Sequence, residues 1–168
     1  RHGPGLFGFE NSSLPAPGIR TPFTNSQQLT YYLRTEFTYT GSLTGVTLTI
    51  DQIVDDGAVY YLNGQELGRS GMPSGSVTFS TTAGRTVSNA VEELGVITAD
   101  GSALVNGTNV LAVEVHQTNR TSSDLVFGMR LNISVPTQPS LQINEVLPGA
   151  AGAGFVEIHN PGAGLINL

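Results

Sequence analysis

Residues 125–133 read LVFGMRLNI, and this stretch decides the fold class. Every odd-numbered position in it is apolar: Leu125, Phe127, Met129, Leu131 and Ile133. Glycine, arginine and asparagine stand among the residues between them. Successive side chains of a β-strand point to opposite faces, so this alternation predicts a strand with one buried face.

Runs with the same period of two recur on both sides of this stretch. They predict strands at residues 31–39, 46–50, 58–62, 65–68, 77–80, 109–116, 141–146 and 155–159. Asn63-Gly64 favours a type I′ hairpin turn, because both central residues of that turn take positive φ. Residues 89–97 are expected to form no more than one helical turn. The predicted fold class is all-β: an antiparallel β-sandwich of jelly-roll type with a short two-strand C-terminal segment.

Proline and glycine mark the expected boundaries. Residues 1–30 contain four prolines and cannot run as a helix, so we expect an irregular arm that Phe7, Phe9 and Phe23 pin to the sandwich. Two further prolines bracket a short polar segment that reads as a linker. The expected organisation is an arm (1–30), a sandwich domain (31–135), a linker (136–140) and a partial domain (141–168).

The composition excludes several classes of partner. Only 12% of the residues are charged, the net charge is −6, and all seven basic residues are arginine. A chain this acidic lacks the basic patch that nucleic acids and anionic membranes require. No apolar run approaches the roughly 20 residues of a membrane span, so no membrane insertion is expected. The chain has no cysteine, which excludes disulfides and thiolate metal sites. Many Ser, Thr, Gly and Asn residues and no lysine favour an extracellular or cell-surface location, with no signal peptide in this chain.

Three segments in order resemble one known module: YYLRTEF (31–37), DDGAVYYLNG (55–64) and GTNVLAVEVHQ (107–117), which continues to SSDL (122–125). They resemble the galactose-binding-like β-sandwich module of large secreted bacterial proteins, over about residues 1–135. The resemblance implies that fold. It leaves carbohydrate binding, recognition and purely structural spacing open as functions.

The C-terminal segment carries a second resemblance. LQINEV (141–146) and FVEIHNP (155–161) are similar to the opening of a bacterial lamin-tail domain, which is immunoglobulin-like. The later strands of that domain have no counterpart in this sequence. An alternative is therefore that these strands pair with another chain by strand addition.

The residue types of a nucleophilic triad occur close together at His116, Ser122, Ser123 and Asp124. A hydrolase needs a serine within hydrogen-bond reach of the histidine, and no Gly-x-Ser-x-Gly elbow is present. The favoured interpretation is that side chains of this segment hold a loop by hydrogen bonds to the backbone. We therefore expect no catalysis.

Asp51, Asp55 and Asp56 are candidate calcium ligands, because calcium prefers several hard oxygen ligands at close range. Their spacing does not match an EF-hand loop. The alternative is a β-turn in which Asp55 or Asp56 caps backbone NH groups beside Gly57. The resemblance implies a structural calcium, which galactose-binding-like modules often carry.

Carbohydrate recognition normally uses exposed aromatic rings beside planar polar groups, and this chain has no tryptophan. Of its tyrosines, Tyr32, Tyr60 and Tyr61 are candidates for exposure, and packing against a neighbouring strand is the alternative. The candidate ligand-binding residues are Tyr61, Asn63, Arg69, His116, Asn119 and Asp124. Asn-x-Ser/Thr sequons, which matter only if the source glycosylates, occur at Asn11, Asn106, Asn119 and Asn132.

These observations predict a non-catalytic extracellular β-sandwich module with a polysaccharide or glycan as its ligand. The alternative is a structural subunit of a cell-surface or filamentous assembly, in which residues 141–168 pair with a neighbouring copy, because unpaired strand edges invite partners. A hydrolase-associated accessory domain is the third hypothesis.

Overall fold

The computed structural model describes residues 2–10, 14, 18–136, 142–147 and 155–159. The chain divides into two compact units, residues 1–135 and 136–168. The elements in chain order are β1 (Phe7–Phe9), β2 (Thr21–Pro22), β3 (Thr30–Tyr39), β4 (Thr47–Asp55), β5 (Gly57–Leu62), β6 (Gln65–Ser70), β7 (Glu92–Asp100), the 3₁₀ turn η1 (Gly101–Ala103), β8 (Gly107–His116), β9 (Leu125–Ser134), β10 (Gln142–Leu147) and β11 (Phe155–His159).

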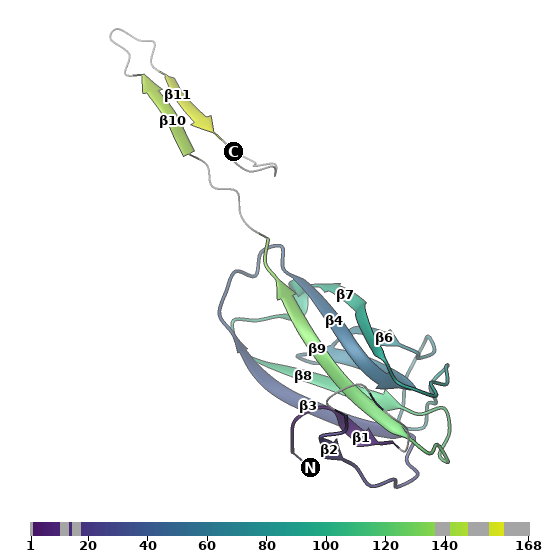
Figure 1. The fold of residues 1–168 in the computed structure, drawn as a ribbon. Coiled ribbons are helices and arrows are strands. Elements are labelled where there is room, and N and C mark those ends of the chain that lie inside the picture. The colour runs from purple at the N-terminus through teal and green to yellow at the C-terminus, as the bar shows by residue number, and fades with distance from the viewer. Residues whose placement is uncertain (1, 11–13, 15–17, 137–141, 148–154, 160–168) are drawn as a thin grey trace. The chain divides into compact units, whose positions relative to one another are not determined.

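The first unit is a β-sandwich of two sheets (Figure 1). One sheet has the strand order β2-β1-β9-β4-β7 and the other has the order β3-β8-β5-β6. Neighbouring strands are antiparallel except for β1 and β2. In the second unit, β10 and β11 form an antiparallel pair. The all-β sandwich with a two-strand C-terminal segment, predicted from the sequence, is confirmed.

The hydrophobic core lies between the two sheets. The alternating stretch forms β9, and its residues Leu125 and Phe127 are buried against Tyr60 and Val113 of the opposite sheet. Val126, on the other face of β9, is also fully buried, because Leu6 of the N-terminal arm and Ala90 cover it. The start of β9 is therefore covered on both faces, and the arm supplies part of the second cover.

The predicted hairpin at Asn63-Gly64 is present between β5 and β6. Asn63 has φ 51° and Gly64 has φ 84°, as a type I′ turn requires. The Asn63 side chain donates hydrogen bonds to the Ala103 carbonyl and to Asn109 Oδ1, each at 2.8 Å. The turn is thus tied to η1 and to β8.

Three expectations from the sequence were wrong. The arm is not wholly irregular, since Phe7–Phe9 forms β1 and pairs with β9. Residues 77–80 form a turn instead of a strand, with Thr81 donating its backbone NH to the Thr78 carbonyl. Residues 92–100 form β7 where a helical turn was expected, because pairing with β4 outweighs the weak local preference for a helix.

β4 is also longer than the alternation of residues 46–50 predicts, because its pairing with β9 continues to Asp55.

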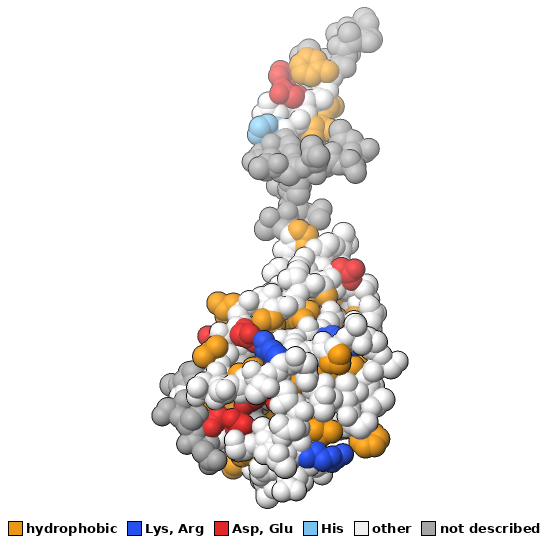
Figure 2. Space-filling view, turned by 90° about the vertical axis from the view of Figure 1, so that its right-hand side faces the viewer, with side chains coloured by type: hydrophobic (Ala, Val, Ile, Leu, Met, Phe, Trp, Pro, Cys, Tyr) orange, Lys and Arg blue, Asp and Glu red, His pale blue; other side chains and the backbone are white. Residues whose placement is uncertain are grey.

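Within the described residues, no helix is long and apolar enough to span a membrane. Figure 2 shows one face of the molecule, on which basic side chains are isolated groups among polar and hydrophobic ones.

Candidate functional site

The outward face of the four-stranded sheet carries a shallow cavity of about 220 Å³. Because side chains alternate along each strand, Leu33 of β3 and Val113 of β8 pack toward the core, whereas Tyr32 and Glu114 point outward. Tyr32 lies opposite Glu114 across the β3–β8 pair. The cavity is lined by Tyr32, Leu33, Arg34, Tyr61, Ala112, Val113 and Glu114.

Glu114 sets the electrostatics of this cavity. Burial raises the pKa of the Tyr61 hydroxyl to about 12, and the charge of Glu114, which accepts a hydrogen bond from that hydroxyl, contributes to the rise. Burial and the charge of Glu114 also raise the pKa of Tyr32. The cavity combines a Tyr32 ring that is 63% exposed with hydroxyl, carboxylate and guanidinium groups.

His116, predicted as a ligand-binding residue, is fully buried and cannot meet a ligand. Its Nδ1 atom lies 2.8 Å from the Thr81 carbonyl and 3.0 Å from Thr30 Oγ1, and its Nε2 atom lies 3.2 Å from Glu114. These contacts tie the loop after β6 to the last residue of β8 and the first residue of β3. His116 is thus a structural residue beside the cavity.

The triad-type residues do not assemble. Ser122 donates its hydroxyl to Asp124 Oδ1 at 3.1 Å, and Ser123 donates to the same atom at 3.4 Å. His116 is engaged elsewhere, as described above. Gln117 donates its amide to the Asp124 carbonyl at 2.8 Å. The segment therefore makes the loop-holding hydrogen bonds that the sequence interpretation favoured.

The other predicted ligand-binding residues also have structural partners. The Arg69 guanidinium donates hydrogen bonds to both oxygens of the Glu66 carboxylate. It also donates to the carbonyls of Pro73 and Gly75. Asn63 is held in its turn, and Asn119 is exposed and accepts hydrogen bonds from Thr121. Of the six predicted residues, Tyr61 alone is among those lining the cavity. Tyr60, also a candidate for exposure, is fully buried.

The three predicted calcium ligands do not form one site. Asp51 accepts hydrogen bonds from the Gly95 amide and from Asn132, both at 2.9 Å, and these bonds lower the pKa of its carboxyl. Asp56 accepts from the amides of Val87 and Thr118 at 2.7 and 2.8 Å, so it caps loops.

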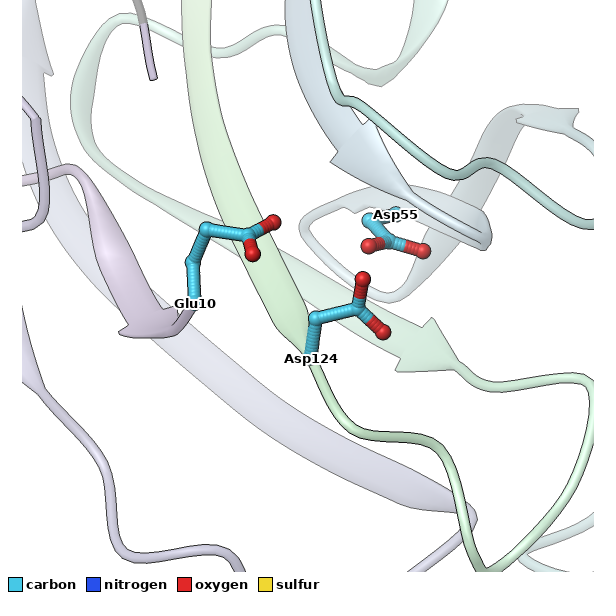
Figure 3. Close-up of side chains that lie close together, drawn as sticks. All are labelled: Glu10, Asp55 and Asp124. Carbon is cyan, nitrogen blue, oxygen red and sulfur yellow. The ribbon is translucent and has the colours of Figure 1, made fainter. Parts of the chain in front are cut away.

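Asp55 instead lies near Glu10 and Asp124, and one oxygen from each of these three groups lies within 4.8 Å of the others (Figure 3). Burial raises the pKa of Asp55 to about 8, and hydrogen bonding to Asp56 and the nearby carboxylates add to the effect. The sequence interpretation therefore found Asp55 but not its companions.

The sequons have different surroundings. Asn106 and Asn119 are exposed, whereas the half-buried Asn132 donates its amide to Asp51. Asn11 lies outside the described residues.

Comparison with known proteins identifies no family and gives a distant structural match. No family model matches the sequence, and no curated protein does. The structure is similar to the crystal structure of an FMN-binding β-glucuronidase from Facaelibacterium prausnitzii L2-6, with a TM-score of 0.40 and 19% identity. The match covers 79% of this chain and 21% of the glucuronidase chain, so this chain spans about a fifth of that protein. A TM-score this low carries no inference about function. The galactose-binding-like and lamin-tail resemblances stay predictions.

Proposed function

We propose that this chain is a non-catalytic β-sandwich module that binds a glycan in the cavity on the outward face of β3, β8 and β5. The observation that carries the proposal is the exposed Tyr32 ring beside Tyr61 and Glu114. Its proposed location is extracellular or at the cell surface, which the composition favours.

The chemistry of the cavity suits a sugar ring. The aromatic ring of tyrosine is apolar and its hydroxyl is polar, so it packs against the C–H face of a pyranose while neighbouring groups bind hydroxyls. Glu114 accepts hydrogen bonds and Arg34 donates them, which matches the mixed character of sugar hydroxyls. The volume of about 220 Å³ is below the roughly 300–1,000 Å³ of drug-sized pockets, so it suits one ring.

The non-catalytic part of the proposal is supported by the surroundings of His116. Both of its ring nitrogens face protein groups, and Ser122 and Ser123 bond to Asp124 instead of to the imidazole. A serine nucleophile needs a base within hydrogen-bond reach. Among the described residues near His116, that arrangement does not occur.

Binding to a panel of soluble polysaccharides, followed by titration calorimetry with the best binder, tests the proposal. Tyr32→Ala and Tyr61→Ala should each weaken binding at least tenfold, because each removes part of the aromatic surface. Phe79→Ala is the matched control, since Phe79 is 69% exposed and does not line the cavity. A blank panel, or equal losses in the control, would contradict glycan binding here.

A second candidate function rests on the β10–β11 hairpin. Its large apolar side chains Ile143, Val146, Phe155, Val156 and Ile158 are all between 47% and 70% exposed. Figure 2 shows hydrophobic side chains at the surface of this hairpin. A two-stranded hairpin is marginally stable alone in water, and exposed strand edges accept further strands. We propose, as the alternative, that this segment pairs with a second copy of the chain and builds an assembly.

Sedimentation of the full chain and of a chain ending at residue 135 tests this alternative. The full chain should form larger particles with rising concentration, and the shortened chain should remain a folded monomer. If both sediment as monomers, self-association through residues 141–168 is excluded.

A further inference from the structure

Three carboxyl groups from distant parts of the sequence meet at one end of the five-stranded sheet (Figure 3). Glu10 follows β1, Asp55 ends β4, and Asp124 precedes β9. β9 pairs antiparallel with β1 on one side and with β4 on the other. The ends of β1 and β4 therefore meet the start of β9, and the pairing of Phe9 with Leu125 brings Glu10 beside Asp124.

The spacing of these groups suits a calcium ion. One oxygen from each carboxyl group lies within 4.8 Å of the other two. Calcium binds oxygen ligands at about 2.3–2.6 Å, so two ligands on opposite sides of one ion are about 5 Å apart. Three carboxylates this close repel one another unless a proton or a cation intervenes.

A separate observation shows that one carboxylate oxygen of Asp55 lacks a protein partner. The residue is 1% exposed, and its buried Oδ2 atom has no hydrogen-bond partner among the described residues. An unpaired buried carboxylate oxygen costs free energy, and most such atoms in proteins are paired. Asp51 and Asp56, on either side of it in sequence, are both paired with backbone amides. The carboxyl group of Asp55 instead points toward Glu10 and Asp124 (Figure 3).

We propose that Glu10, Asp55 and Asp124 bind one calcium ion, and that this ion clasps residues 2–10, the first part of the N-terminal arm, to the sandwich. Glu10 belongs to the arm, whereas the other two ligands belong to the ends of β4 and β9. Only three residues of this segment, those of β1, pair with β9, and Leu6 packs on Val126. One ion that bridges three segments would therefore add to these contacts and hold this segment more firmly.

The ion site lies on the five-stranded sheet, and the glycan cavity lies on the other sheet. The two proposals can therefore fail separately. The proposed calcium site shares only Asp55 with the expected set Asp51, Asp55 and Asp56.

Calorimetric titration of the chelator-treated full chain with calcium chloride tests the site. Glu10→Gln and Asp55→Asn should each weaken calcium binding at least tenfold. Asp51→Asn is the matched control and should bind as the natural chain does, because Asp51 is paired elsewhere. Magnesium chloride should bind more weakly, since magnesium demands shorter ligand distances and octahedral geometry. Glu10 is half-buried, so Glu10→Gln remains informative if Asp55→Asn does not fold.

Limited chymotrypsin digestion, with cleavage after Phe7 and Phe9 followed by mass spectrometry, tests the clasp. Calcium should slow these cleavages at least fivefold in the natural chain and leave them unchanged in Glu10→Gln. No calcium binding at millimolar concentration, or equal weakening in Asp51→Asn, would overturn the site. Calcium binding without protection of the arm would overturn the clasp.

Discussion

A Cβ atom added to Gly8 would overlap the carbonyl oxygen of Leu125. Gly8 also has φ 135°, in a region that residues with side chains rarely adopt. β1 can therefore lie against β9 only because position 8 is glycine. Since Glu10 follows β1 by one residue, this close approach also sets where the arm's carboxylate lies.

Gly8→Ala should release the arm and so weaken calcium binding, although it removes no carboxylate. We expect at least a tenfold loss of calcium affinity in calorimetry and faster chymotrypsin cleavage at Phe7. Gly84→Ala is the control, because a Cβ at Gly84 would meet other atoms only at 3.7 Å or more. Unchanged calcium affinity in Gly8→Ala would show that the arm does not contribute to the site.

Asp55 should make the calcium-free protein less stable as the pH rises. Its pKa is about 8 in the folded chain and 3.8 ordinarily, so the folded state holds the proton more tightly than the unfolded state does. This stabilisation is complete below pH 4 and is lost as the pH rises through 8. Urea unfolding in chelator between pH 4 and 9 should show this decline in the natural chain.

Asp55→Asn should remove that part of the pH dependence, and Asp51→Asn should keep it. Saturating calcium should also suppress it, because the bound ion holds Asp55 ionised. An identical pH profile for the natural chain and Asp55→Asn would contradict the prediction.

Asn63→Ala should destabilise the hairpin in two ways. Alanine must adopt a left-handed φ at about 1–2 kcal/mol, and the hydrogen bonds to Ala103 and Asn109 are lost. Asn63→Gly loses the same hydrogen bonds but adopts positive φ freely, so its loss should be smaller. Chemical unfolding of both variants measures the difference, and equal losses would show that the backbone conformation at this position costs nothing.

Tyr60→Phe should lower the free energy of unfolding by roughly 1–3 kcal/mol. The Tyr60 hydroxyl donates to Gln52 Oε1 inside the sandwich, where Gln52 is 1% exposed. The variant leaves that buried oxygen without its donor. Urea unfolding should show the loss, and a change below about 0.5 kcal/mol would mean that another group replaces the hydroxyl.

The sequence predicts strands well where one face meets the core. β3, β8 and β9 alternate clearly, because their inward side chains pack between the sheets. β7 is different: it is an edge strand that exposes Glu92, Leu94 and Gly95, and its stability comes from pairing with β4. No local sequence pattern indicates such pairing, so the sequence of residues 89–97 was expected to form one helical turn at most.

The candidate sites were predictable only in part for a related reason. Asp55 and Tyr61 lie in the segment 55–64, which the sequence analysis singled out, but the residues that surround them in the two sites come from other parts of the chain. Glu10 joins Asp55 through the β1–β9 and β9–β4 pairs, and Tyr32 joins Glu114 through the β3–β8 pair. The register between strands that are far apart in the sequence determines these neighbours. That register cannot be derived from the local pattern of a single sequence.

Tyr60 and Tyr61 are consecutive, yet one ring is buried between the sheets and the other lines the outward cavity. Because the chain has no tryptophan, its ultraviolet emission comes from five tyrosines. A ligand in the cavity should therefore change the emission of Tyr32 and Tyr61 while Tyr60 stays shielded. The protein thus carries its own optical reporter of occupancy, with an internal reference one residue away.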